Sequence, residues 1–431
     1  MKKLLLILII TPLLLIAQNQ NLTLKDAILI GIKESKILKI SEKKIYSSKA
    51  KEREQFGTLF PTIKLQSGYN YQSSVPEFKL PNSNLALFPL IQNVYSTKLS
   101  IQQPIFTGWK LTSASKITEE QRKISEIEFS KENIEVIFQI TTTYWNLYRA
   151  QQLEKYALEN LEFAKTSYKD VSQYLLKGIA TENDLLKANI RITNSEIALS
   201  ETRSGVATTE LVFNILLNKN IEEKYILTSN LTEENIVFDK LQNYISKGIE
   251  NRKDLLISNK RIESAKLNKN IASSGYYPQM FIQSNYYSSR PNQRYFPLKN
   301  ELKDSWDIGL LVQYDFWNLF YSYYEVEHAT AQIDQSEINH SILKDGIMLE
   351  ITQNYYSAER SVEKVRLAKL ANEQSEENFR ITKNKYNNGL VTISELNDAQ
   401  NIFNQSKIQF IQSLVDQKIA IAKLNKSIGE Y

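Results

Sequence analysis

Two short stretches of the sequence combine a glycine, a threonine and a carboxylate at the same spacing. They contain Gly178, Thr181 and Asp184 in one case, and Gly389, Thr392 and Glu395 in the other. Glycine just past a helix supplies the left-handed residue that ends it. Threonine followed three residues later by an acid is the spacing of an N-terminal capping box. Each stretch therefore predicts a tight turn between two helices, in which the acid bonds the first amides and favours the helix dipole.

The rest of the chain offers few residues for catalysis or metal binding. The 431 residues include no cysteine, two histidines and 12 glycines, which excludes thiolate metal sites and cysteine nucleophiles. His328 follows Glu325 and Glu327, but without a second histidine or cysteine nearby we expect it, like His340, on a solvated helix face. No phosphate-binding loop, nucleophile elbow or zinc-protease motif occurs, so we predict no enzyme, cofactor or metal site.

The first 17 residues are typical of a secretory signal peptide, because Lys2 and Lys3 precede an apolar run that ends at Ala17. The run is too short to span a membrane, and Leu15 in place of a small residue leaves the cleavage site open. Without this segment 51 basic and 48 acidic residues remain, a net charge of +3 that indicates no nucleic-acid partner. We expect an exported protein, and the lack of cysteine excludes a lipid-anchored N-terminal cysteine.

Long stretches without proline predict very long helices. No proline occurs between Pro104 and Pro278, and apolar residues recur every three to four positions from about Thr112 to Leu176. A helix of that length would extend roughly 100 Å at about 1.5 Å per residue. Because an ordinary compact domain cannot contain it, we predict an extended bundle or coiled coil.

Prolines and aromatic residues gather instead in two windows, 61–106 and 278–316, and each window holds two segments of alternating apolar and polar residues. This period of two predicts half-buried strands. Of the 45 aromatic residues, 15 lie between Tyr276 and Tyr324. Aromatic clusters flanking strands of about ten residues are typical of an outer-membrane barrel wall, although an ordinary sandwich sheet gives the same alternation.

The chain is an internal duplication. A shift of 211 residues superimposes the two glycine–threonine–acid stretches. It also pairs Tyr144 with Tyr355 and Arg149 with Arg360. Each half is therefore helix, strand, strand, long helix, tight turn, helix. Two strands per half give four, which cannot close a barrel, and open strand edges are not tolerated in lipid, so strands of several chains must combine; three chains would supply twelve.

These features together resemble the TolC family of outer-membrane efflux proteins. The resemblance rests on the signal peptide, the duplicated layout, the two turns, Leu59-Phe60-Pro61 and the segment Gln-Pro-Ile-Phe-Thr-Gly at 103–108. It implies a mainly α chain with a membrane β-barrel part, and a homotrimer whose 12-strand barrel, four strands per chain, stands on a long periplasmic α-helical barrel. It also implies a passive exit duct in the outer-membrane lipid that docks onto a periplasmic adaptor and an inner-membrane pump.

The expected boundaries follow from the repeats. They are a signal peptide at 1–17, a first repeat at 18–217, an equatorial linker at 218–240 and a second repeat at 241–431. The first repeat holds strands at about 62–73 and 95–106, a long helix at about 110–176 and a tip turn at 177–182. The second holds strands at about 279–289 and 305–316, a long helix at about 318–387 and a tip turn at 388–393. Loops 75–94 and 290–304 are expected to face the exterior.

The resemblance also gives the turns a function. It matches Glu395 and Asp398 to paired entrance carboxylates of the family, which share a helix face at i and i+3. Three copies would then place six carboxylates around a narrow mouth that repels anions. Glu395 thus remains either a helix cap or a gate residue, whereas Asp398 lies beyond the capping box and favours the gate, and Asp184 is expected only to cap. The turns carrying Gly178, Thr181, Asp184, Gly389 and Thr392 would dock the adaptor.

Two departures from the family pattern matter. Val391 stands where the best-known member has an arginine that bonds across the closed entrance, and 316–318 reads Phe-Trp-Asn where the first half has Phe-Thr-Gly at 106–108. A tyrosine cluster at 321–324 either stacks an aromatic substrate or anchors the junction of barrel and helices at the membrane interface.

Two other protein classes would also follow a signal peptide with long helices. A trimeric coiled-coil surface adhesin predicts sustained heptads and no duplicated strand pairs. A periplasmic adaptor predicts one helical hairpin and glycine-rich β-domains. Neither accounts for the 211-residue duplication.

Overall fold

The computed structural model describes residues 20–74, 91–229, 231, 236–296 and 298–431, so the expected signal peptide at 1–17 and most of the expected outer loop at 75–94 lie outside it. The helices are α1 (Leu24–Glu34), α2 (Lys36–Gly57), α3 (Lys110–Leu176), α4 (Glu182–Leu216), α5 (Leu241–Asn251), α6 (Lys253–Ser273), α7 (Asn318–Asn387) and α8 (Ile393–Ser427). The strands are β1 (Gln20–Leu22), β2 (Thr62–Tyr71), β3 (Asn93–Phe106), β4 (Tyr225–Leu227), β5 (Gln279–Arg290) and β6 (Lys303–Gln313).

The chain divides into two compact units that do not follow the sequence repeats. One comprises Met1–Ile40, Ser130–Arg252 and Asp345–Tyr431, and the other comprises Ser41–Phe129 and Lys253–Lys344. Each unit therefore contains parts of both repeats. Among the helices of the described ranges, none is long and apolar enough to cross a membrane.

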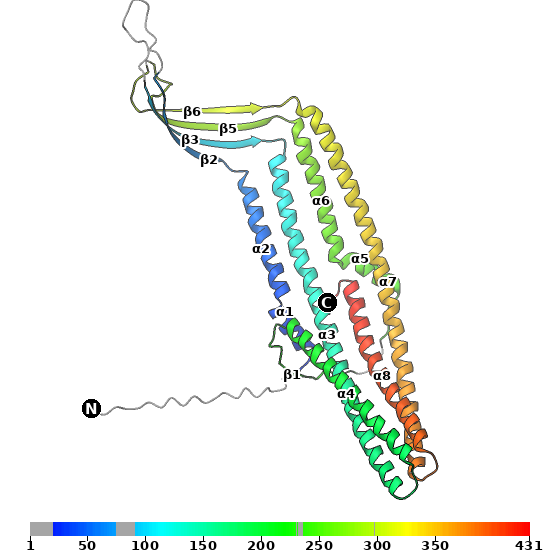
Figure 1. Cartoon of the computed structure of the whole chain (residues 1–431). Helices are drawn as coiled ribbons and strands as arrows, with labels where there is room; N and C mark the ends of the chain where they lie inside the picture. The colour runs from blue at the N-terminus through cyan, green and yellow to red at the C-terminus, as the bar shows by residue number, and fades with distance from the viewer. Residues whose placement is uncertain (1–19, 75–90, 230, 232–235, 297) are drawn as a thin grey trace, which may run out of the picture. The chain divides into compact units, whose positions relative to one another are not determined.

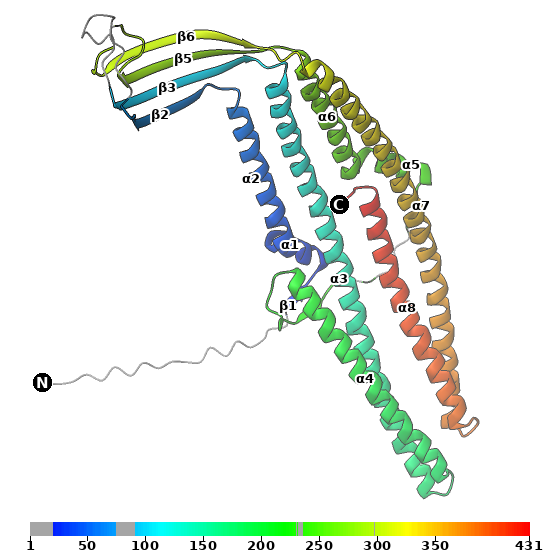
Figure 2. The same ribbon diagram turned by 45° about the horizontal axis from the view of Figure 1, so that its top comes forward.

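The second unit carries a four-stranded antiparallel sheet in the order β2-β3-β5-β6, whose strands lie side by side in Figures 1 and 2. The pairing of β3 with β5 joins the two repeats, with Lys98 opposite Tyr287. Large apolar side chains on one face are open in the single chain, since Ile63 is 69%, Trp306 71% and Ile308 66% exposed. Strands β2 and β6 each end the sheet without a further partner among the described strands, so the sheet has two edges to be covered.

The two strand-to-helix junctions differ, as the sequence departure at 316–318 indicated. Before α3, Gly108 and Trp109 both take positive φ angles of 62° and 63°. Before α7, the Asp315 carboxylate instead accepts a 2.9 Å bond from the backbone amide of Trp317. This turn ends β6 at Gln313, three residues before the predicted end of the strand.

Helices α3 with α4 and α7 with α8 form two long helical hairpins (Figure 2), and the tips of both belong to the first unit. The duplication is repeated in their packing. A side chain on Gly31 of α1 would meet Ile140 of α3, and one on Gly248 of α5 would meet Ile351 of α7, each within 2.2 Å. Ile140 and Ile351 are 211 residues apart, so the same close crossing of a short helix over a long one is built twice.

A tyrosine at matching positions, buried Tyr144 and half-buried Tyr355, ties each long helix to a segment distant in sequence. The Tyr144 hydroxyl donates to the backbone oxygen of Leu22 in β1 at 2.9 Å, and Tyr355 donates to the oxygen of Asp239 at 3.1 Å. Strands β1 and β4 pair in parallel, and β4 lies in the stretch 218–240 expected to be a linker. The sequence did not predict either strand, because three residues are too few to show an alternation.

Candidate functional site at the helix tips

Both long helices end in the same turn. Gly178 follows α3 and Gly389 follows α7, and both have φ of +72°. The backbone amide of Ile179 donates to the oxygen of Tyr174 at 2.8 Å, and Leu390 donates to Lys385 at 2.9 Å. This is the hydrogen-bond pattern with which a left-handed glycine closes a helix. The two turns therefore reverse the chain sharply and start α4 and α8 at matching places.

At the first turn, Thr181 and Asp184 form a complete capping box. The Thr181 hydroxyl accepts from the Asp184 amide at 3.2 Å, and the Asp184 carboxylate accepts from the Thr181 amide at 3.0 Å. Hydrogen bonds from the Thr181 hydroxyl and amide lower the pKa of Asp184. This carboxylate is thus engaged in capping α4.

At the second turn, only half of this exchange forms among the described residues. The Thr392 hydroxyl accepts from the Glu395 amide at 3.3 Å. The same hydroxyl donates to the Glu395 carboxylate at 3.2 Å. Glu395 is exposed. Its longer side chain leaves the carboxylate less engaged than that of Asp184, which keeps it accessible to solutes.

Asp398 lies one turn further along α8 and is exposed. It faces a cation from the other hairpin, Arg191 of α4. The Arg191 guanidinium donates to the Asn401 side-chain oxygen at 3.0 Å and to the Asn397 backbone oxygen at 3.4 Å. Burial lowers the pKa of Arg191, and the charge of Asp398 acts against this shift. An arginine stays protonated under such conditions, so it holds a positive charge against α8.

Further polar side chains continue this contact away from the tip. The Asn404 amide of α8 donates to the Asn160 oxygen of α3 at 2.8 Å. The Asn160 amide then donates to Ser195 of α4 at 3.3 Å. We call the polar contacts of Arg191 and Asn160 with α8 the hairpin seam. Within the described structure, Arg191 Nη1 is buried without a hydrogen-bond partner, so the hairpin seam is incompletely satisfied.

Aromatic rings cross between the same two hairpins. Tyr174 of α3 and Tyr386 of α7 meet edge to face with centroids 6.4 Å apart. Burial, with the nearby Tyr174 and Asp170, raises the pKa of Tyr386 to about 12. Phe379 of α7 likewise meets Phe163 of α3 at 6.0 Å. The hairpins therefore touch through a few rings and polar groups just above the tips.

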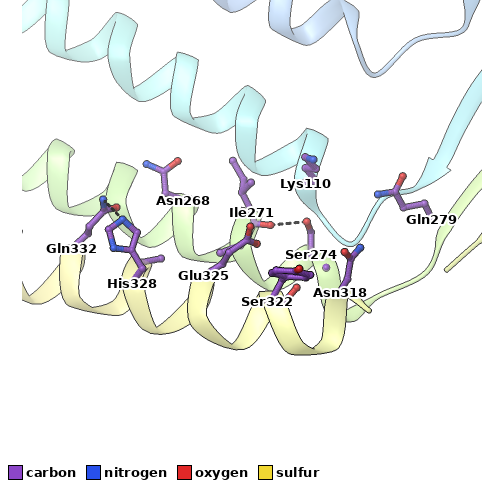
Figure 3. A pocket seen from close by; sticks show the side chains of 14 residues that line it. Lys110, Asn268, Ile271, Ser274, Gln279, Asn318, Ser322, Glu325, His328 and Gln332 are labelled. Carbon is purple, nitrogen blue, oxygen red and sulfur yellow. Dashed lines mark hydrogen bonds between the residues drawn. The ribbon is translucent and has the colours of Figure 1, made fainter. Parts of the chain in front are cut away.

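The second unit contains a groove with mixed chemistry, shown in Figure 3. It is lined by Lys110, Glu325 and His328 among other residues, and has a volume of about 630 Å³. His328 and Gln332 approach within 3.1 Å through side-chain nitrogens. In the described ranges, no group of three or more histidine, aspartate or glutamate side chains is placed to hold a metal ion. Tyr321 of the tyrosine cluster also lines this groove.

Known proteins place these features in a family. The model of the outer membrane efflux protein family matches residues 35–215 and 244–430. The chain belongs to the outer membrane efflux protein family. No curated protein matches it significantly by sequence.

Solved structures share the fold of this outer membrane efflux protein. The Campylobacter jejuni outer membrane channel CmeC matches with a TM-score of 0.80 at 16% identity, over 94% of this chain and 85% of that one. The open state of the Neisseria gonorrhoeae MtrE outer membrane channel matches with a TM-score of 0.78 at 13% identity, over 94% and 89%. The Vibrio cholerae outer membrane protein VceC matches with a TM-score of 0.78 at 14% identity, over 94% and 96%.

Family membership and the shared folds confirm the predicted mainly α chain with duplicated repeats, and identify it as an outer-membrane efflux duct. The surface-adhesin alternative is not supported. The family is one of transport ducts rather than enzymes.

Sequence reasoning missed Arg191, which bonds α4 of one hairpin of this efflux protein to α8 of the other. The 211-residue shift pairs Arg191 with Ile402, so the charge belongs to the first repeat alone. That asymmetry was the available signal, but only the packing of α4 against α8 gives it a partner. Val391, where the resemblance led us to look for a basic residue, is half-buried and carries no charge.

Proposed function

We propose that three copies of this chain form one duct, with their sheets closed into a twelve-stranded barrel and their hairpins into a helical tunnel. The two open sheet edges and the exposed apolar face support this, because lipid tolerates neither an unpaired edge nor a polar outer wall. The duct would conduct substrates from a periplasmic adaptor and an inner-membrane pump. The same proposal includes residues 1–17 as a signal peptide that directs export of the chain.

The gate in this proposal lies at the helix tips. Glu395 and Asp398 would ring the entrance, and the turns at Gly178 and Gly389 would meet the adaptor. The observation that carries the proposal is the pair of hydrogen bonds from Arg191 to α8, because they link α4 to α8 beside these carboxylates in the hairpin seam. Opening requires the α7/α8 hairpin to move relative to α3/α4, which breaks these contacts while leaving each hairpin intact.

A disulfide across the hairpin seam tests this mechanism. The chain contains no cysteine, so the pair Arg191→Cys and Asn401→Cys introduces the only thiols. The matched control is Glu154→Cys with Arg203→Cys, which joins α3 to α4 within one hairpin and outside the seam, where these side chains lie 3.4 Å apart. Export by cells would be measured under oxidising and reducing conditions.

We expect the cross-hairpin disulfide to stop export and a reductant to restore it, while the control exports under both conditions. If the oxidised Arg191→Cys, Asn401→Cys protein exports as well as the control, the hairpins do not separate at the seam and the proposed gate is wrong.

A further inference from the structure

The two faces of the four-stranded sheet differ in chemistry. Residues paired across antiparallel strands share a face, so the registers assign Lys98, Tyr287 and Ser305 to one face. The same registers assign Leu99, Tyr286 and Trp306 to the other. The second face is apolar and meets lipid in the proposed barrel. The face of Lys98 therefore lines the interior.

The segment that follows β5 folds back onto this interior face. Asn292 is only 4% exposed, and its amide donates to the Lys303 backbone oxygen at 2.8 Å. Its side-chain oxygen accepts from the Arg294 amide at 3.0 Å. Arg294 is thus carried over the sheet, where its guanidinium pairs with the Asp307 carboxylate. Arg294 is therefore held over the Lys98 face of the sheet by its contacts with Asp307 and Tyr287.

A second cation lies beside this one. The Arg294 guanidinium carbon is 4.2 Å from the centre of the Tyr287 ring, and Lys98 Nζ is 5.4 Å from the same centre. Asp307 neutralises Arg294, whereas no carboxylate of the described residues lies within ion-pair distance of Lys98. Among the described residues, the cluster therefore carries one uncompensated positive charge per chain.

The same side chains line a cavity of about 540 Å³, which is the size of a small-molecule site. Besides Lys98, Tyr287 and Arg294, hydrogen-bonding groups of Gln66, Ser96 and Ser305 line it. The cavity lies at the loop end of the sheet, because the opposite strand ends lead directly into α3 and α7. Cationic, hydroxyl and amide donors around one space suit an anion.

We propose that this cavity binds anionic solutes, through carboxylate, sulfonate or phosphate groups, at the external end of the duct. The inference rests on the proposed trimeric barrel, which turns the Lys98 face inward and arranges three such cavities around the exit. The positive charge of this cavity is opposite in sign to the charge of Glu395 and Asp398 at the tips. Lys98 and Arg294 then determine which solutes are retained at the exit, whereas the tip carboxylates act at the entrance.

Block of current by an anion tests the site. The purified protein is added to one chamber of a phosphatidylcholine bilayer, whose headgroups are zwitterionic. The helical part cannot cross the bilayer, so the loops face the opposite chamber. Benzene-1,3,5-tricarboxylate is added to that chamber, with the current recorded before and after. The variants are Lys98→Gln, Lys98→Arg and the control Lys64→Gln, which removes a lysine from the same face outside the cavity.

We expect half-block of the Lys98→Gln channel to need about tenfold more tricarboxylate than the wild type, because each copy loses a charge-assisted contact. Channels of Lys98→Arg and of Lys64→Gln should be half-blocked at the same tricarboxylate concentration as the wild type. Equal block of Lys98→Gln and wild type, or equal loss in Lys64→Gln, would overturn the site. The current before the anion is added reports on the duct itself, so an open channel that is indifferent to the anion rejects the exit site alone.

Discussion

Removing Arg191 should open the tip. In Arg191→Ala, α8 loses the 3.0 Å bond to Asn401 and the weaker 3.4 Å contact with the Asn397 backbone. A hydrogen bond from a charged donor contributes about 1.5–3 kcal/mol. Solvent reaches the half-exposed guanidinium and screens the bond. The substitution also removes the cost of burying the other half of that charge, so the net loss is about 1 kcal/mol per chain.

The size of the effect depends on how the three copies move. Independent hairpins would shift the closed-to-open ratio by roughly fivefold each, whereas a concerted opening adds the three losses to about 3 kcal/mol, or roughly 100-fold. Single-channel recording in a planar bilayer gives the open probability directly. A large rise in open probability would therefore indicate concerted opening as well as the role of Arg191.

The control is another arginine of α4. Arg203 bonds Glu154 of α3 at 3.4 Å, within its own hairpin, so Arg203→Ala should leave the open probability unchanged. Arg191→Lys keeps the charge near Asp398 but loses the planar fork of donors, and should lie between wild type and Arg191→Ala. The reasoning is refuted if Arg191→Ala opens no more often than Arg203→Ala.

Three further predictions concern the residues of the two tip turns. Glu395→Ala combined with Asp398→Ala should give channels of higher conductance and lower cation selectivity, measured by reversal potentials under a salt gradient. Gly389→Ala should destabilise the protein by about 1 kcal/mol, because φ is +72° although a Cβ would meet nothing within 4 Å; Gly205→Ala inside α4 should stabilise it by about 0.5–1 kcal/mol, and denaturant titration compares the two. Thr181→Ala should speed amide exchange in the first turn of α4 at neutral pH. Part of its effect should be lost in acid. The folded-state pKa of Asp184 is lowered, so its carboxylate contributes fully above the unfolded pKa of about 3.9 and this contribution is lost as pH falls through the lower folded value. The bond from the Asp184 amide to the Thr181 hydroxyl does not depend on this titration and remains.

Much of the architecture could be read from local patterns. Apolar spacing and the absence of proline predicted the helices that the structure places at 110–176 and 318–387, because helix bounds depend on residues close in sequence. The capping box of Thr181 follows for the same reason. Strand ends were less exact, since β6 stops where Asp315 turns the chain, a contact that alternation does not report.

The hairpin seam could not be predicted in this way. Arg191 and Asn401 are 210 residues apart, and neither residue type nor spacing indicates that they meet. The inward fold of Arg294 onto Tyr287 is similar, because the loop sequence gives no sign of the face on which it lies. Strand β4 was missed because its parallel partner β1 is some 200 residues away and both are short.

The sequence by itself determined the duplication, the two left-handed glycine turns and the strand alternation that separates an apolar face from a polar face. These depend on backbone preferences and on periods of two and 3.6 residues, which any short window carries. Only the tertiary structure decided which charged groups lie near one another, namely Arg191 with Asp398 near the tip, and Lys98 with Arg294 over the Tyr287 ring. Such contacts depend on how distant helices and strands pack, and packing brings together residues that no local pattern connects.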